Sequence, residues 1–334
     1  MKGKFQNEVG PWKMDFGGAI KAQWNTREYD KSPNSPIPLF PLATETLDKM
    51  TEPTLVRLGH STILLKLGED YVLTDPMFSE RASPVQWAGP RRFHPPALDI
   101  ESLPPIKAVI ISHDHYDHLD KQSIVQLVDR VEHFVTPLGV GKRLQRWGVP
   151  ADAIVELDWW QELQLGELTL AATPAQHFSG RGLFDRNKTL WASWVVMGAG
   201  ARVFFSGDTG YFDGFRDIGE RYGPFDITMI ENGAYNFAWR DIHMMPEDSV
   251  RAHLDLRGKV MLPIHNSTFD LSLHPWYEPM ERVAALAVEQ GITLATPIMG
   301  EPLAVLDPAP TLAWWRGLEG EQMADAAEAC SGTC

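Results

Sequence analysis

The amino-acid sequence predicts an α/β protein in which two β-sheets pack against each other and helices cover their outer faces. Segments rich in Val, Ile, Leu, Phe and Thr outnumber helical patterns by about two to one. The first of these segments follow one another in pairs, unlike the strict alternation of a parallel βαβ array. A chain of 334 residues with 44% hydrophobic and 22% charged side chains is long enough to bury such a core.

The individual elements follow from composition and periodicity. Strands are expected at residues 54–67, 71–74, 107–112, 133–136, 163–172, 191–197, 202–206, 226–230 and 260–264. Helices are expected at residues 121–131, 139–147, 246–256 and 275–290. The last helix stops before Gly291, in the position where a C-cap glycine is typical.

These elements predict one domain with an N-terminal strap and a C-terminal tail. Residues 1–53 show little apolar periodicity and contain several prolines, which is typical of an extended segment lying on a core: Pro11, Pro33, Pro36, Pro38 and Pro41. Residues 54–318 carry the predicted strands and helices. Residues 319–334 form a small-residue tail that we expect to be flexible.

Composition and charge argue against several classes of function. A net charge of −14 repels phosphate backbones, so nucleic acid is not expected as a partner. No apolar run is long enough to span a membrane and no signal peptide is evident, which predicts a cytoplasmic protein. The sequence does not decide between a monomer and a homo-oligomer. The two cysteines, Cys330 and Cys334, lie in the tail, so any metal must be bound by histidine and carboxylate side chains.

The strongest chemical signal is an H-x-H-x-D-H motif at residues 113–118, which lies between an apolar run and a helical pattern. Alternate residues of an extended segment point the same way, so His113 and His115 can share one metal. Asp117 and His118, at the turn into the helix, can face a second metal. So many imidazole and carboxylate groups in a short turn would repel or desolvate one another without a cation.

Further candidate ligands stand at the ends of later predicted strands, namely His177, Asp208 and His265. A polar residue after an apolar strand is most often the solvent end of that strand, so each is weak evidence alone. Together with the motif they make five histidines and two aspartates. That set matches two metal sites that share a bridging carboxylate and keep positions open for water and substrate.

The order of these motifs resembles the metallo-β-lactamase superfamily. Within it, the chain is similar to the N-acyl-phosphatidylethanolamine-hydrolysing phospholipase D group, from about residue 58 to 298, in these segments: LGHST at 58–62, LTDPMFS at 73–79, RASP at 81–84, GPRRF at 89–93, NKTLWASW at 187–194 and GDTGY at 207–211. The resemblance implies an αββα sandwich of two mixed β-sheets flanked by helices, with a dinuclear metal site at one edge.

The resemblance also implies two sets of metal ligands and a bridging carboxylate: His113, His115 and His177 for one zinc; Asp117, His118 and His265 for the other; and Asp208 between them. His243 matches a histidine that lies near the metals without binding them. His60 and Asp75 match residues that support the ligands from behind. Zinc is the expected metal, with iron or manganese as alternatives.

The implied chemistry is hydrolysis by a hydroxide that bridges two divalent cations, with catalytic roles for Asp117, Asp208 and His243. Arg91 and Arg92 form the basic cluster expected near the site and could receive a phosphate. We therefore expect a phosphodiesterase of phospholipase D type acting on a small-molecule or lipid-derived substrate.

Two alternatives to that function remain. The first is a lactonase or another ester or amide hydrolase, because the same metals polarise a carbonyl equally well. The second is a non-catalytic metal-binding scaffold. Tryptophans between the ligands, Trp87, Trp239 and Trp276, are candidates for the rim of a substrate pocket.

Overall fold

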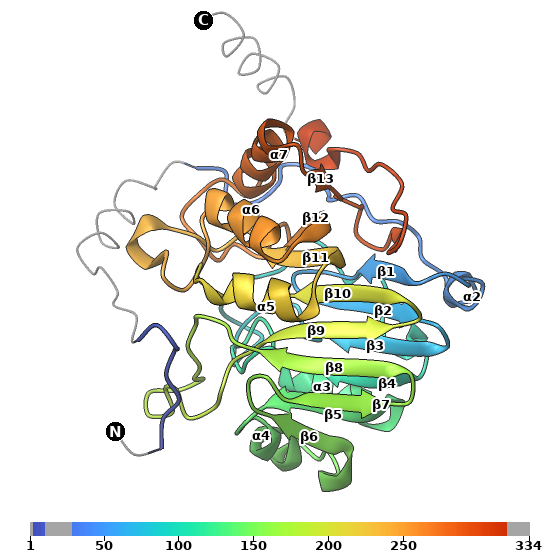
Figure 1. Cartoon of the computed structure of the whole chain (residues 1–334), viewed down its shortest axis with the longest axis vertical. Helices are drawn as coiled ribbons and strands as arrows, with labels where there is room; N and C mark the ends of the chain where they lie inside the picture. The colour runs from blue at the N-terminus through green and yellow to red at the C-terminus, as the bar shows by residue number, and fades with distance from the viewer. Residues whose placement is uncertain (1–2, 11–28, 319–334) are drawn as a thin grey trace, which may run out of the picture.

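Two seven-stranded β-sheets face each other in the structure of the chain, a computed structural model that describes residues 3–10 and 29–318 (Figure 1). The predicted tail at 319–334, with Cys330 and Cys334, and residues 11–28 of the predicted strap lie outside the described residues. Helices cover the outer face of each sheet. The fold is therefore the αββα sandwich that the sequence predicts.

The first sheet joins an antiparallel half to a parallel half. Its strands lie in the order β14 (Pro302–Ala304), β1 (Thr54–Arg57), β2 (Ile63–Leu67), β3 (Asp70–Thr74), β4 (Ile106–Ile110), β5 (Val131–Pro137) and β6 (Ile154–Leu157). Pairing is antiparallel from β14 to β3 and parallel from β3 to β6.

The second sheet has the same division. Its order is β13 (Thr293–Leu294), β12 (Gly258–Ile264), β11 (Phe225–Glu231), β10 (Ala201–Phe205), β9 (Ser193–Gly198), β8 (Leu168–Thr173) and β7 (Glu162–Leu165). Pairing is parallel from β13 to β10 and antiparallel from β10 to β7. Because both sheets contain the two kinds of pairing, both are mixed sheets.

Helices lie outside the sheets and in the connections. The α-helices are α2 (Thr44–Asp48), α3 (Lys121–Leu127), α4 (Gly141–Arg146), α5 (Gly214–Tyr222), α6 (Pro246–Asp255) and α7 (Glu278–Gln290). Short 3₁₀ turns are η1 (Ile100–Ser102), η2 (Val128–Arg130), η3 (Ala151–Ala153), η4 (Phe237–Trp239) and η5 (Trp314–Leu318). Gly291 ends α7 with φ +66°, which confirms the predicted glycine C-cap.

Both faces of the central strands are buried, and this explains their continuous apolar sequences. In β10, Phe205 lies between the two sheets, whereas Phe204 lies under the outer helices with Phe215 of α5. In β4, Ile110 faces the other sheet and Val109 packs toward α3 and α4. Helices α3 and α4 thus cover the first sheet, and α5, α6 and α7 cover the second.

Two segments predicted as single strands are hairpins instead. Residues 54–67 form β1 and β2 around a tight turn, in which the Leu58 N–H donates to the Thr62 carbonyl at 2.9 Å. Residues 163–172 form β7 and β8 around Gly166, whose φ is +63°. The sequence did not separate the strands of either pair because apolar residues continue up to the turns.

Other helices and strands were not predicted, or were predicted to be longer than they are. Helix α5 was missed because its glycines lower helix propensity, and β6, β13 and β14 are short edge strands. The helix predicted at 121–131 ends at Leu127, because a 3₁₀ turn and then β5 follow it.

The described part of the predicted strap contacts both the sandwich and the C-terminal region. The Phe40 N–H donates to the Met299 carbonyl at 2.8 Å, and Leu39 forms a parallel bridge with Met299. Ile37 packs in a cluster with Trp276 and other aromatic side chains. Among the residues that the structure describes, no helix combines the length and apolar character needed to span a membrane.

The inter-sheet core gives a first prediction. Phe205→Ala removes a fully buried ring between the sheets and should lower the free energy of unfolding by about 3–5 kcal/mol. Phe184→Ala is the matched control, because Phe184 is 86% exposed and should change stability by no more than about 0.5 kcal/mol. Urea denaturation measures both, and equal effects would contradict the placement of Phe205.

Candidate metal centre

The H-x-H-x-D-H motif occupies the connection between β4 and α3. Asp120 fixes the start of α3, since its carboxylate accepts hydrogen bonds from the main-chain N–H groups of Gln122 and Ser123. This cap fixes the point at which the preceding loop ends. Within the loop, His113 and His118 are almost completely buried, and the Asp117 side chain is 16% exposed.

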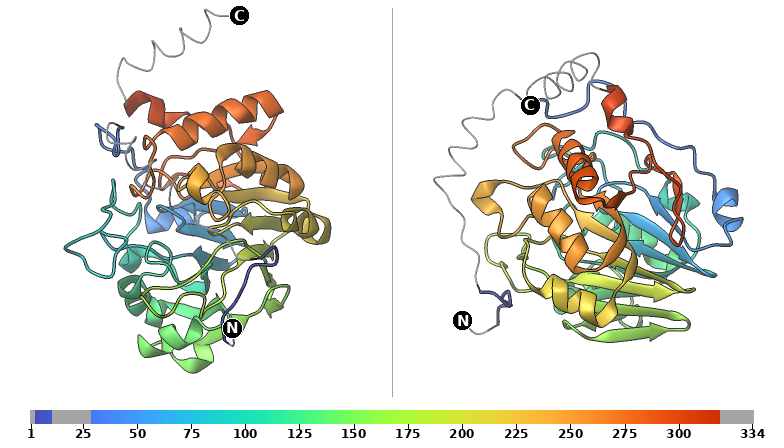
Figure 2. Two further views of the ribbon diagram at one scale, coloured as in Figure 1. Left: turned by 90° about the vertical axis from the view of Figure 1, so that its left-hand side faces the viewer. Right: turned by 45° about the horizontal axis from the view of Figure 1, so that its top comes forward.

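Other polar residues reach the same edge from both sheets. His177 follows β8, Asp208 follows β10 and His265 follows β12. The loops after β8 and β11 project from the left-hand side of Figure 1 and face the viewer in the left panel of Figure 2. The carboxyl ends of parallel strands meet at one edge of a sheet, so strand ends distant in sequence come together there.

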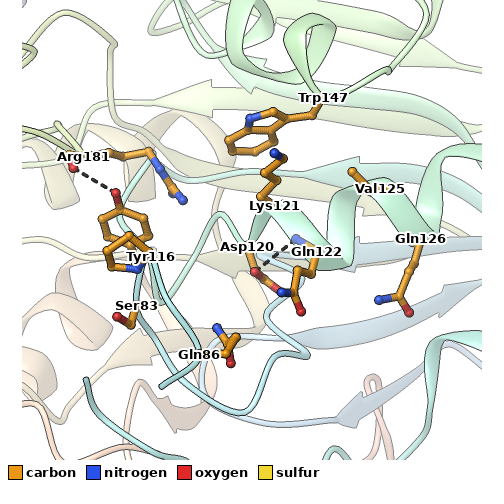
Figure 3. A pocket seen from close by; sticks show the side chains of 11 residues that line it. Ser83, Gln86, Tyr116, Asp120, Lys121, Gln122, Val125, Gln126, Trp147 and Arg181 are labelled. Atoms are coloured by element: carbon orange, nitrogen blue, oxygen red, sulfur yellow. Dashed lines mark hydrogen bonds between the residues drawn. The ribbon is translucent and has the colours of Figure 1, made fainter. Parts of the chain in front are cut away.

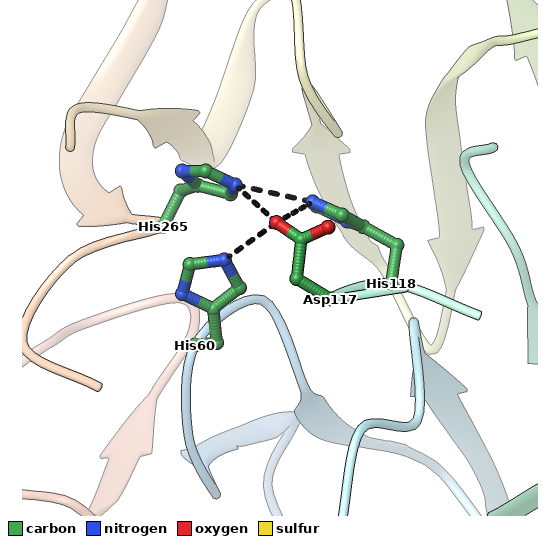
Figure 4. A group of neighbouring side chains, drawn as sticks. All are labelled: His60, Asp117, His118 and His265. Atoms are coloured by element: carbon green, nitrogen blue, oxygen red, sulfur yellow. Dashed lines mark hydrogen bonds and ion pairs between the residues drawn. The ribbon is translucent and has the colours of Figure 1, made fainter. Parts of the chain in front are cut away.

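The converging side chains form two separate groups, each with ligand atoms within 4.8 Å of one another: His113, His115, His177 and Asp208; and His60, Asp117, His118 and His265. A third group, Asp208, Glu231, His243 and His265, meets the same limit and shares Asp208 and His265 with the other two. Figure 4 shows the second group, in which the three imidazole rings surround the Asp117 carboxylate. Buried imidazoles and carboxylates at such spacing are the donor set that binds divalent cations in proteins. The two clusters therefore indicate divalent metal binding.

Asp208 lies between the two groups and faces each with a different oxygen. Its Oδ1 is 3.1 Å from Nε2 of both His118 and His265. Its Oδ2 is 3.7 Å from Nε2 of His113 and 3.8 Å from Nε2 of His177. This arrangement is the one that a bridging carboxylate requires.

Burial and neighbouring charges set the protonation of these groups. Burial lowers the pKa of His113 and of His177 well below its ordinary value, which favours the neutral imidazole that a metal needs. Burial acts to raise the pKa of Asp208, but His118 and His265 outweigh it and hold that pKa well below its usual range. The carboxylate is therefore ionised.

His118 and His265 have the opposite shift. Burial lowers their pKa values, but the facing Asp208 and Asp117 carboxylates outweigh this effect. The pKa of His118 rises well above its ordinary value, and that of His265 rises to about 9. In the metal-free protein these two rings are therefore protonated at neutral pH.

Hydrogen bonds behind the ligands fix the orientation of several rings. The Asp75 carboxylate accepts from Nδ1 of His118 at 2.7 Å, and from the Ser112 N–H and hydroxyl at 2.7 and 2.5 Å. Nδ1 of His177 donates to the Ile242 carbonyl at 3.0 Å. Each bond at Nδ1 leaves Nε2 directed at the cluster, which is the usual support for a metal-binding imidazole. Asp75 thus lies in the supporting position predicted for it.

His60 is placed differently from its prediction. Instead of lying behind the ligands, it faces them: its Nε2 is 3.3 Å from Oδ2 of Asp117, and its ring is 4.0 Å from that of His265. Burial lowers the pKa of His60 to about 3, so the ring is neutral. The β1–β2 turn that carries His60 was predicted as continuous strand, and this hid its position.

Glu231 is a residue of the cluster that the sequence analysis missed. It is the last residue of β11 and is fully buried. Its Oε2 accepts from Nδ1 of His243 at 2.9 Å, and its Oε1 accepts from the Met244 N–H at 2.7 Å. Burial raises the pKa of Glu231. The signal in the sequence was a lone carboxylate at the end of an apolar run, near the strand end where the other candidates also stand.

A hollow of about 310 Å³ opens over the cluster. Its polar side includes His115, Asp117, Asp208, His243 and His265. Its apolar walls are Phe178, Ala234, Trp239, Ile242 and Leu271. A substrate that enters this hollow would meet candidate metal ligands and His243 on one side and apolar surface on the other.

The predicted phosphate-binding arginines do not line this hollow. Arg91 is exposed and pairs with Glu80 at 2.6 Å, while Arg92 donates to the Met77 carbonyl at 3.2 Å. Both line a separate hollow that contains none of the candidate ligands.

The three tryptophans also have different surroundings. Trp239 lines the hollow over the cluster, but Trp87 is 83% exposed. Trp276 is buried and stacks on Trp314, which makes it part of the core.

A larger hollow, of about 660 Å³, lies beside the metal-binding loop and is lined by Tyr116, Trp147 and Arg181 among others (Figure 3). The Arg181 guanidinium stacks on the Tyr116 ring at 3.8 Å and donates to the main-chain carbonyls of Asp114 and Leu119 at 2.9 and 2.6 Å. Arg181 thereby supports the backbone of the loop that carries the candidate ligands.

A family model for the beta-lactamase superfamily domain matches residues 70–266, more than half of the chain. The chain belongs to the metallo-β-lactamase superfamily. The matched span includes every candidate metal ligand except His60. Membership in the metallo-β-lactamase superfamily supports a metal-dependent hydrolase, in agreement with the His and Asp clusters.

Known proteins resemble the chain to different degrees. An uncharacterized protein of Mycobacterium tuberculosis is 51% identical over 262 residues, which cover 77% of this chain and 70% of that protein. N-acyl-phosphatidylethanolamine-hydrolyzing phospholipase D 1 of Caenorhabditis elegans is 37% identical over 243 residues, covering 69% and 68%. The solved isothiocyanate hydrolase from Delia radicum gut bacteria has a TM-score of 0.60 at 22% identity, covering 75% and 98%, which shows the shared fold.

The raised histidine pKa values predict that metal binding releases protons. Below about pH 9 the His265 ring is protonated, so a metal that binds its Nε2 must displace a proton. Metal affinity should therefore rise with pH up to about pH 9. Titrating zinc into the metal-free protein at pH 7.5 in weak buffer should therefore acidify the solution.

His265→Ala should release about one proton fewer per protein in the same titration. His253→Gln is the control, because His253 bonds to Thr228 outside the cluster and burial lowers its pKa to about 4. Zinc binding without acidification would contradict the assigned protonation.

Proposed function

We propose that the chain is a dinuclear metal-dependent hydrolase and that it acts as a phosphodiesterase of the N-acyl-phosphatidylethanolamine phospholipase D type. The observation that carries the dinuclear proposal is the position of Asp208, with one oxygen toward each group of histidines. One cation would be held by His113, His115 and His177. The other would be held by Asp117, His118 and His265, with His60 at the same group.

Two divalent cations held there would supply an activated water and would stabilise the negative charge that develops on the carbonyl or phosphoryl oxygen under attack. The chain's own residues provide the geometry. Asp117 lies in both the second cluster and the lining of the hollow, so it can orient a water molecule toward a substrate. Glu231 fixes the orientation of His243, which lines the same hollow and can give a proton to the leaving group.

The similarity to the worm phospholipase D supports the phosphodiester as substrate class, and the apolar walls of the hollow suit an acylated molecule. A second candidate, an ester or lactone hydrolase, is favoured by a separate observation. Among the described residues that line the hollow there is no arginine or lysine, so a phosphate would find no cationic side chain there. A neutral carbonyl substrate needs none.

The bridging role of Asp208 gives a direct prediction. Asp208→Asn removes the negative charge shared by both groups, so the protein should bind fewer than two metals and lose at least about 100-fold in kcat. Asp213→Asn is the matched control, because Asp213 is exposed and lies in the same segment. Elemental analysis and turnover measure the two effects, and an Asp208→Asn protein with full metal and activity would refute the assignment.

The substrate class is tested by comparing phosphodiesters with lactones in one protein preparation. Zinc-loaded protein should cleave bis(p-nitrophenyl) phosphate, and N-acyl-phosphatidylethanolamine in detergent micelles, more efficiently than acyl lactones, as judged by kcat/KM. Trp239→Ala, which removes an apolar wall of the hollow, should raise KM for the long-chain substrate more than for the small one. Opening of lactones alone would assign the protein to the second candidate function.

A further inference from the structure

The N-terminal segment 3–10 contacts the loop that carries His177. The Asn7 side chain is 7% exposed, its Nδ2 donates to the His177 carbonyl at 2.9 Å, and its Oδ1 accepts from the His177 N–H at 3.0 Å. One side chain thus pairs with both polar main-chain groups of a candidate metal ligand 170 residues away. In Figure 1 this dark-blue segment runs beside the loop that follows β8.

The position of Asn7 is itself fixed. Nε1 of the buried Trp191 donates to Oδ1 of Asn7 at 2.9 Å and to the Ala175 carbonyl at 2.9 Å. The Phe5 N–H donates to the Asn187 carbonyl at 2.9 Å, which ties the segment to the far end of the same loop. Both polar atoms of the amide are paired, as a buried amide requires.

His177 depends on these contacts because it lies beyond the end of β8. The sheet ladder stops at Thr173, and beyond it Gln176 is joined to the loop after β10 by an isolated bridge with Gly210 and by its N–H, which donates to the Thr209 hydroxyl at 2.8 Å. The His177 ring is held at Nδ1 by the Ile242 carbonyl, and its main chain is held by Asn7. Together these bonds direct Nε2 toward Asp208, at 3.8 Å.

We propose that Asn7 is a positioning residue of the metal centre, and that the N-terminal segment completes the site formed by His113, His115 and His177. The inference rests on the proposed dinuclear centre. The segment lies outside the region that the family model matches. A carboxamide suits the task because it offers a donor and an acceptor side by side, and neither Asp nor Ala can replace both bonds.

The test is metal retention by the full chain loaded with zinc and dialysed against increasing concentrations of a chelator. Wild-type protein should hold two zinc ions. Asn7→Ala and the isosteric Asn7→Asp should lose one of them at a chelator concentration at least about tenfold lower, as expected when the support of a metal-binding histidine is removed. The second zinc should be retained as in wild type.

Which zinc is lost can be assigned by combining variants. His177→Ala should lose the same zinc, so Asn7→Ala added to His177→Ala should change nothing further. Asn7→Ala combined with His265→Ala should weaken the retention of both zinc ions. The control is Thr44→Ala, because the Thr44 hydroxyl donates to the Ser102 carbonyl at 2.9 Å and so ties the predicted strap to the core without touching His177.

The outcomes separate the two proposals. Two zinc ions in wild type, with unchanged retention in both Asn7 variants, would overturn the role of Asn7 and leave the dinuclear centre standing. Equal loss of both zinc ions from the Asn7 variants and from Thr44→Ala would also overturn it, because that pattern reflects general loosening of the strap. Fewer than two zinc ions in wild type would refute the dinuclear centre, and with it this inference.

Discussion

The structure depends on bringing buried imidazoles and carboxylates to one edge of the sandwich. Nε2 of His265 lies 3.1 Å from Nε2 of His118, and Nε2 of His113 lies 2.8 Å from Nδ1 of His115. Groups at this spacing, removed from water, need a proton or a cation between them. The Asp120 helix cap, the Asp75 hydrogen bonds and the Arg181 contacts with the loop all hold backbone that would otherwise move apart.

The polar and the apolar sides of the hollow over the cluster have different roles. Divalent cations held by the histidines and Asp208 would polarise a carbonyl or a phosphoryl group equally well, so these residues do not choose between the two substrate classes. The apolar walls, which come from loops after β8, β11 and β12, are the part of the site that can discriminate. Loops on a rigid scaffold usually have this role, since they vary without disturbing the core.

The sequence predicted the sandwich from its apolar strands and four candidate ligands from their dense spacing, both of which are local signals. His177, Asp208 and His265 were weak signals that gained weight only beside the motif and the resemblance to the superfamily. The sequence did not predict the positions of residues that depend on a turn or on a contact with a distant part of the chain. His60 lies in a hairpin turn that reads as strand, and Glu231 stands alone after apolar residues. Arg92 was expected at the site, but its guanidinium bonds to the Met77 carbonyl instead. Asn7 carries no sequence signal, since its partner is far along the chain.

The two groups proposed to hold the cations each draw on both sheets. In the first, His113 and His115 come from the sheet with β4, whereas His177 and Asp208 come from the sheet with β8 and β10. Each of these two groups therefore joins side chains from both halves of the sandwich, whereas a third group, Asp208, Glu231, His243 and His265, comes from the second sheet alone. The turns at Gly166 and Gly200 lead into β8 and β10, beyond whose far ends lie the candidate ligands His177 and Asp208. Because these turns lie at the opposite ends of their strands from the candidate ligands, they are the places where added residues should disturb the clusters least.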